Sequence, residues 1–281
     1  MNPRYAQRFT FALAILAGVA VAGVVISIVL AVKGSSTNSS GPWSSWAPQD
    51  SGPQGAREIA DHIAPLYRIS GVDQLAVVTV SNLGNASAAT SSASSAASSQ
   101  SSPGGPLVAV RPSANSSSIS LISGSTVAYN LCGLGSSNCS IGIGTPSTDR
   151  LLLLRREALE LALYTFKYLP QTQNVVAILP PGHQATTSSL TAKPPSASPS
   201  AKPLDMALLF QHQELSPFLS QPLDQTFTQQ FPPTVPQIPL WKQTTEAALV
   251  EQITARGIFS EHTTTAQDGT NLIVLDPLPP S

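Results

Sequence analysis

The residues of this chain best suited to chemistry are two cysteines close together in sequence. Cys132 and Cys139 bracket the segment Gly-Leu-Gly-Ser-Ser-Asn. This spacing fits a small disulfide-closed loop formed in an oxidising compartment. A redox-active pair is the alternative, but it usually has the tighter C-x-x-C spacing and a setting that lowers a thiol pKa. We therefore predict a structural disulfide between Cys132 and Cys139, and the lack of clustered histidines argues against a zinc site.

The histidines and carboxylates show no catalytic or metal-binding spacing. The four histidines are scattered, at His62, His183, His212 and His262. Glu58 and His62 form the one i, i+4 pair in a predicted helix, and we interpret it as an ordinary surface ion pair. We expect no metal site.

Motifs of the common enzyme classes are missing from the sequence. The chain contains neither the G-x-S-x-G of a nucleophile elbow nor the S-x-x-K of penicillin-recognising enzymes. It has no phosphate-binding loop and no H-E-x-x-H motif, and Gly142-Ile-Gly144 lacks the third glycine of a dinucleotide fingerprint. We therefore predict no catalytic residue and no cofactor.

A cluster of charged residues lies near the start of the strongest helical segment. Its members are Asp149, Arg150, Arg155 and Arg156. Because backbone amides at a helix start point outward, an anion site is one interpretation. A solvated face is the other, and we favour it.

The segments that must position these residues include four with helical periodicity, at 56–69, 145–169, 204–215 and 241–256. In the second, Thr145 is the predicted N-cap and Pro146 the first helical residue. Gly257 is the predicted C-terminal cap of the last. The charged residues expected on the solvated side of the second helix are Arg155, Arg156, Glu160 and Lys167.

Apolar and β-branched runs predict strands at 75–80, 107–110, 119–131 and 175–179. Ser123-Gly124-Ser125 interrupts the third run, and we expect a hairpin turn there. Asp268-Gly269 predicts a second hairpin, with a two-residue type I′ turn between 261–267 and 270–275. Because helices interleave with hairpins, we predict one α+β domain.

The uncharged run from Phe9 to Val32 has the length of a membrane span. As a helix it reaches roughly 36 Å, against about 30 Å for a hydrocarbon core. Arg4 and Arg8 precede the run and Lys33 follows it, which predicts a cytoplasmic N-terminus. The alternative is a cleaved signal peptide, whose apolar region normally has only about 7 to 15 residues.

The predicted organisation follows from this anchor. We expect a cytoplasmic stub over 1–8, a transmembrane helix over 9–32, a flexible tether over 33–55 and an extracytoplasmic domain over 56–281. Two low-complexity stretches, at about 81–106 and 183–203, are expected to be disordered insertions. Trp43 and Trp46 interrupt the tether, and both docking onto the domain and contact with the membrane surface remain open.

Composition limits the partners. The formal net charge is -1 and only 10% of residues are charged. Such a chain has no field that would attract nucleic acid, so we expect no nucleic-acid partner.

The cysteine loop is followed by the segment Arg150-Leu-Leu-Leu-Leu-Arg-Arg-Glu-Ala-Leu-Glu-Leu-Ala-Leu-Tyr-Thr-Phe-Lys-Tyr-Leu and then by Val175 to Pro181. This arrangement resembles uncharacterised single-span envelope proteins of actinobacteria. The resemblance spans 132–182 and carries over no activity and no functional residue. We expect a membrane-anchored, extracytoplasmic binding or accessory protein, in contact with membrane lipid through its N-terminal helix and with an envelope protein or glycan as partner. The alternative is a surface-anchored hydrolase whose catalytic groups converge only in the folded chain.

Overall fold

The computed structural model describes residues 42–83, 105–113, 116, 118–134, 139, 147–181 and 205–278. The predicted membrane span at 9–32 and most of the two predicted insertions lie outside these ranges. None of the helices in the described ranges combines the length and apolar character that crossing a bilayer requires.

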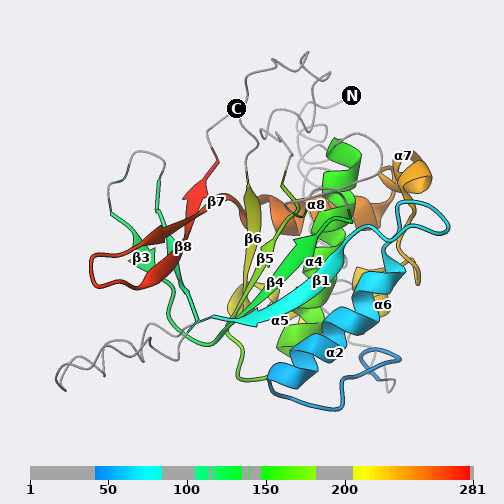
Figure 1. Cartoon of the computed structure of the whole chain (residues 1–281). Helices are drawn as coiled ribbons and strands as arrows, with labels where there is room; N and C mark the ends of the chain where they lie inside the picture. The colour runs from blue at the N-terminus through cyan, green and yellow to red at the C-terminus, as the bar shows by residue number, and fades with distance from the viewer. Residues whose placement is uncertain are drawn as a thin grey trace, which may run out of the picture. The chain divides into compact units, whose positions relative to one another are not determined.

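An eight-stranded mixed sheet forms the centre of the fold (Figure 1), which confirms the predicted α+β class. Its strand order is β1-β4-β5-β6-β7-β8-β2-β3. The β4/β5 and β2/β8 pairs are parallel and the other pairs antiparallel. The strands are β1 Val77–Asn82, β2 Leu107–Val110, β3 Ser120–Leu121, β4 Thr126–Cys132, β5 Asn174–Ile178, β6 Met206–Gln211, β7 Ile258–Thr265 and β8 Asn271–Pro277.

The sheet is strongly curled, as its connections require. Six inter-strand spacings separate β3 from β4 in the sheet order, about 29 Å if the sheet were flat. Yet only residues 122–125 join the two strands, and five Cα–Cα steps reach at most about 19 Å. The Asn174 side chain holds this connection beside β5 by donating to the Ser123 carbonyl at 2.9 Å. The concave face contains a buried apolar cluster of Val108, Val176, Ala207, Leu209, Ile273 and Leu275.

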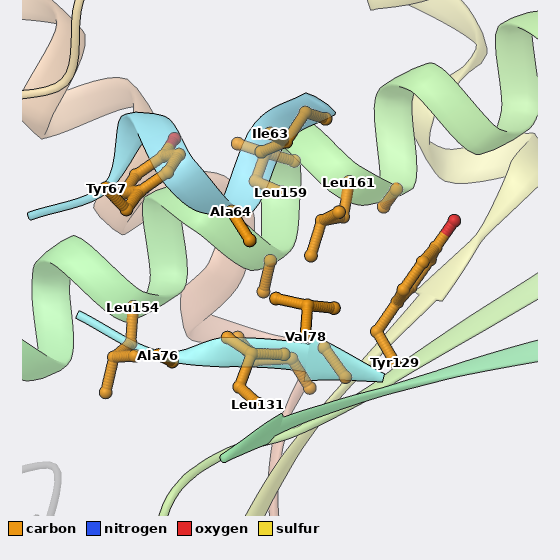
Figure 2. Packing of buried hydrophobic residues seen from close by; sticks show 14 of the residues in the cluster. Ile63, Ala64, Tyr67, Ala76, Val78, Tyr129, Leu131, Leu154, Leu159 and Leu161 are labelled. Atoms are coloured by element: carbon orange, nitrogen blue, oxygen red, sulfur yellow. The ribbon is translucent and has the colours of Figure 1, made fainter. Parts of the chain in front are cut away.

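Helices cover the opposite, convex face over β1, β4, β5 and β6. Val78 and Tyr129 from the strands face Leu161 of α4 (Figure 2), within the largest apolar cluster. The helices are α2 Pro53–Ile63, η1 Ala64–Leu66, α4 Thr148–Tyr168, α5 His212–Leu219, α6 Leu223–Thr226, η3 Val235–Gln237, α7 Ile238–Trp241 and α8 Thr245–Ala255. Ser147 is the N-cap of α4, and its hydroxyl accepts from the Arg150 amide at 3.2 Å. The predicted cap residues Thr145 and Pro146 lie outside the described residues.

The predicted helix at 204–215 is wrong in its first half. Residues 206–211 form β6, between β5 and β7, and the helix α5 begins only at His212. The run Met206–Phe210 is buried throughout. A short, continuous apolar run does not distinguish a fully buried strand from a buried helix, which explains the error.

The predicted hairpin at Ser123-Gly124-Ser125 is also wrong. The strand before it, β3, pairs with β2, whereas β4 pairs with β1 and β5. Gly124 has a φ of 95°, so the segment does turn sharply, but it carries the chain between distant strands of the curled sheet.

The second predicted hairpin is confirmed, with a different turn. The strands β7 and β8 pair from Phe259 to Thr265. Gly269 has a φ of 84°, but Asp268 lacks the positive φ that a type I′ turn needs. The Gly269 amide donates to the Ala266 carbonyl at 3.0 Å and the Ala266 amide to the Thr270 carbonyl at 2.8 Å. These bonds fit a longer loop in which glycine occupies the left-handed position.

The chain is packed against the domain well before Gly55, where the predicted tether would end. Helix α2 begins at Pro53. The rings of Trp43 and Trp46 lie 5.3 and 5.7 Å from the ring of Tyr164 on α4. Of the two interpretations of these tryptophans, the structure shows docking onto the domain.

Candidate functional site

The arginines that the sequence assigns to a solvated face of α4 are buried. Arg155 and Arg156 are each 1% exposed and Glu160 is 8% exposed, whereas Lys167 is exposed as predicted. The prediction was wrong because α4 has neighbours on every side: the sheet, α2, α5 and α8 all pack against it.

Arg156 is the centre of a paired network. Its Nε lies 2.7 Å from Glu246 Oε1, and its Nη1 lies 3.1 Å from Glu160 Oε2 and 2.6 Å from the Tyr67 hydroxyl. Tyr67 donates in turn to Glu160 at 2.5 Å. Burial alone would lower the pKa of Arg156, but Tyr67, Glu160 and Glu246 together raise it above its ordinary value.

Arg155 also directs its donors at protein acceptors. Its Nε donates to Thr254 Oγ1 at 2.6 Å and its Nη2 to the Glu251 carbonyl at 2.8 Å. Asp149, at the start of α4, pairs with Lys242 at 2.9 Å. Arg155 and Arg156 therefore stabilise the interior and do not form a solvated face, whereas the Asp149–Lys242 pair lies at the surface. Arg150 is 5% exposed, and its Nη1 has no hydrogen-bond partner among the described residues.

Glu157 is a buried carboxyl group of a different kind. It is 0% exposed, and neither carboxyl oxygen has a hydrogen-bond partner among the described residues. Burial, and secondarily the charge of Glu160, raises the pKa of Glu157 well above its ordinary value. The Glu157 carboxyl group is therefore harder to ionise in the folded protein than in the unfolded chain.

The predicted Glu58–His62 ion pair is absent from the described contacts. The His62 ring instead stacks on Trp46, with centroids 4.0 Å apart, and burial lowers its pKa. Glu58 accepts from the Gln49 amide at 2.6 Å. Both side chains therefore help to hold the segment before α2 against the domain.

His262 belongs to a separate charged group on β7, β8 and the end of β2. Its Nδ1 lies 3.1 Å from Asp276 Oδ2, and Arg111 Nε lies 2.5 Å from Asp276 Oδ1. Ser260 donates to the Asp276 main-chain carbonyl at 3.3 Å. Among the described contacts the serine does not bond to the histidine, so the group lacks the nucleophile–base contact of a catalytic triad.

The predicted cysteine pair is found at disulfide distance. Cys132 ends β4 and Cys139 lies in the loop that follows, where the Gly133 amide donates to the Cys139 carbonyl at 2.7 Å. Within the described ranges, no three His, Cys, Asp or Glu side chains gather as metal ligands would.

An open cleft of about 380 Å³ lies at one end of the concave face. Its lining combines buried or half-buried apolar side chains of the sheet, such as Leu209 and Phe259, with exposed polar or charged ones, such as Gln211 and Arg256. We call the apolar group the floor of the cleft and the polar group its rim. Its lining residues are Val110, Ser120, Leu121, Ile122, Ser123, Leu209, Gln211, Glu214, Arg256, Gly257 and Phe259.

The rim of this cleft contains two oppositely charged residues, Glu214 and Arg256, whose backbone is positioned by β6. Helix α5 follows β6 directly, which places Glu214 in its first turn. Arg256 follows the end of α8, beside Gly257, whose carbonyl accepts from the Leu209 amide at 2.8 Å. A Cβ at Gly257 would lie 2.5 Å from the Leu209 carbonyl oxygen, so only glycine allows this approach. Arg256 and Glu214 are exposed, and neither forms an ion pair within the described ranges.

Sequence reasoning missed this cleft. Its residues come from four segments that meet only because the sheet curls. Gly257 directly follows Arg256, the C-cap of α8, where a capping glycine is expected, but its φ is not positive, so it does not form a left-handed cap. The close approach of Gly257 to β6 is visible only in the structure, because the sequence indicated no more than a helix end there.

Comparisons of this chain with protein-family models, with curated proteins and with solved structures found no match.

Proposed function

We propose that this chain is a membrane-anchored, extracytoplasmic binding or accessory protein of the cell envelope, and that the cleft on the concave face is its binding site. The observation that carries the proposal is the combination of an apolar floor with two opposite charges on the rim. Burial of apolar surface supplies affinity, and a few well-placed charges orient the bound partner. The envelope partner is a protein or a glycan.

The uncharged run from Phe9 to Val32 supports the anchor, and the cysteine pair supports an oxidising compartment. In this proposal the N-terminus is cytoplasmic and the domain lies outside. Residues 33–42 separate the anchor from the docked Trp43, so the domain stays within about 40 Å of the membrane.

Protease treatment of intact cells tests this topology. A tag at the C-terminus should be digested from outside, whereas a tag at the N-terminus should be digested only after lysis. Digestion of both tags in intact cells, or of neither, contradicts the proposed orientation.

Site-specific crosslinking tests the cleft. A photoreactive residue is placed at Gln211, on the rim, or at Gln267, which is also exposed and lies at the tip of the β7–β8 hairpin. With the full chain in intact cells, we expect a crosslinked envelope partner from position 211 and none above background from position 267. Absence of a specific product at position 211 would refute the proposed site.

A surface hydrolase is the second candidate, because Ser260, His262 and Asp276 share one side of the β7–β8 hairpin. In the structure the serine hydroxyl faces a main-chain carbonyl, which disfavours it as a nucleophile. A fluorophosphonate probe that labels the wild type but not the Ser260→Ala variant would favour the hydrolase. Equal labelling of the two, or none, would remove this candidate.

A further inference from the structure

We propose that the cleft binds an extended peptide segment of a partner protein, which adds as a strand to the free edge of β3. The inference rests on the proposed function and deepens it by naming the chemistry of the partner. Strand addition is a recurrent mode of peptide recognition, in which main-chain hydrogen bonds supply affinity and pockets for alternate side chains supply specificity.

The lining of the cleft shows that it follows a strand edge. Ser120, Leu121, Ile122 and Ser123 are consecutive in the chain, and all four line the cleft. Side chains in an extended segment alternate between the two faces of a sheet. The four consecutive residues therefore fit a cleft that follows the backbone of β3 and of the connection after it.

The pairing of β3 identifies the groups that this edge offers. Ser120 pairs with Val110, and the Ile122 amide donates to the Val108 carbonyl at 2.9 Å. Residues in an antiparallel ladder alternate between bonding to the partner strand and pointing away from it. The N–H and C=O of Leu121, between these two residues, therefore point toward the free edge.

Among the described strands, the outer edge of β3 is unpaired. The strand lies at the end of the sheet order, and no strand in the described part of the chain pairs with its outer side. The Leu121 side chain is 48% exposed. An exposed edge with unpaired main-chain groups is a template for pairing with another chain.

The rest of the cleft determines the kind of segment that fits. Alternate side chains of an added strand would face the floor at Leu209 and Phe259, so they should be apolar. Glu214 and Arg256 on the rim would then pair with one basic and one acidic side chain of the segment. A glycan would offer hydroxyl groups to the rim, but no strand to pair with Leu121.

Two substitutions at Leu121 separate the backbone from the side chain. Leu121→Pro removes the outward N–H, and proline is tolerated on an edge where the N–H faces solvent. Leu121→Ala is the matched control, because it truncates the side chain and keeps the N–H. In the full chain with the crosslinker at position 211, we expect capture to fall at least tenfold in Leu121→Pro and less than threefold in Leu121→Ala.

The outcomes of this experiment are distinct. Undiminished capture by Leu121→Pro overturns strand addition but leaves the binding function in place. An equal loss in both variants also overturns it, because the side chain would then carry the contact. A product that glycan-degrading enzymes remove and proteases leave intact shows a glycan partner, which overturns strand addition. If the unsubstituted chain captures no specific product from position 211, the proposed binding site itself is refuted, and strand addition with it.

A measurement that leaves the protein unaltered guards against misfolding of the proline variant. The segment identified in the crosslinked product is synthesised with free amides, and again with N-methyl groups on alternate amides. We expect the methylated peptide that blocks the β3-facing edge to bind the full chain at least tenfold more weakly than the free peptide. Equal affinity of both methylated registers and the free peptide would overturn the proposal.

Discussion

The two faces of the curled sheet use the same charged residue types for different purposes. Under the helices of the convex face, Arg156 is 1% exposed and contacts Glu160, Glu246 and Tyr67. At the cleft of the concave face, Arg256 is exposed and has no ion-pair partner among the described residues. A buried charge must be paired to be tolerated, whereas an exposed one remains available to a ligand. Burial and pairing, rather than residue type, therefore distinguish the structural charge of Arg156 from the exposed charge of Arg256, to which we assign a binding role in our proposal.

The largest expected effect comes from removing the buried charge. Arg156→Met should lower the free energy of unfolding by about 3–5 kcal/mol, because it leaves Glu160 and Glu246 buried without their partner. Arg256→Met is the matched control and should change it by less than about 0.5 kcal/mol. Denaturant unfolding of both variants without reductant measures the difference. Similar losses in the two would break the contrast between the faces.

The Tyr67 hydroxyl should have the next largest effect. Tyr67→Phe removes a hydrogen bond to Glu160 and one from Arg156, so we expect a loss of about 1.5–3 kcal/mol. Tyr168→Phe, at a partly exposed tyrosine whose hydroxyl contacts the Trp46 carbonyl, should cost less than about 1 kcal/mol. Denaturant unfolding compares the two variants. An equal loss of unfolding free energy in both would show that the Arg156 network does not depend on Tyr67.

The unpaired Glu157 gives a prediction that depends on pH. Because burial raises the pKa of Glu157 in the folded state, the unfolded chain releases this proton first as the pH rises above the ordinary value of 4.5. The contribution of Glu157 to the free energy of unfolding is therefore fully present below pH 4.5, and it is lost as the pH rises toward the pKa of Glu157 in the folded state. Glu160 and Tyr67 are the titratable groups that act on the same site.

Replacing Glu157 should remove this pH dependence. Glu157→Met should raise the free energy of unfolding on the order of 1 kcal/mol at pH 7, and the gain should shrink toward pH 4.5. Unfolding of wild type and variant across this range gives the difference directly. A gain that does not change with pH would show that Glu157 is not titrating differently in the folded and unfolded states.

The smallest effect on stability, with a clear effect on binding, is expected at the rim of the cleft. The double variant Glu214→Gln and Arg256→Gln should change the free energy of unfolding by less than about 0.5 kcal/mol. Capture of the envelope partner from position 211 should nevertheless fall several-fold, because the orienting charges are gone. Undiminished capture would show that the apolar floor alone carries the interaction.

The sequence predicted those features that are local in the chain. The apolar periodicity before Pro170 indicated α4, Asp268-Gly269 indicated the β7–β8 hairpin, and the spacing of Cys132 and Cys139 indicated their pairing. Each signal lies within a few residues of the feature that it predicts.

Features that depend on distant contacts were missed. Arg155 and Arg156 have the spacing of a solvated helix face, and only the packing of α2 and α8 on α4 shows that they are buried. The cleft depends on the connection from β3 to β4, which forces the sheet to curl and brings Leu121 near Leu209 and Arg256. No local pattern in the sequence encodes that curvature.

The most direct test of the account is the comparison of crosslinking from positions 211 and 267 in intact cells. We expect a discrete envelope partner from position 211, several-fold less of it in the Glu214→Gln and Arg256→Gln double variant, and only background from position 267. Equal products from both positions, unchanged by the double variant, would contradict the assignment of the concave cleft as the binding site.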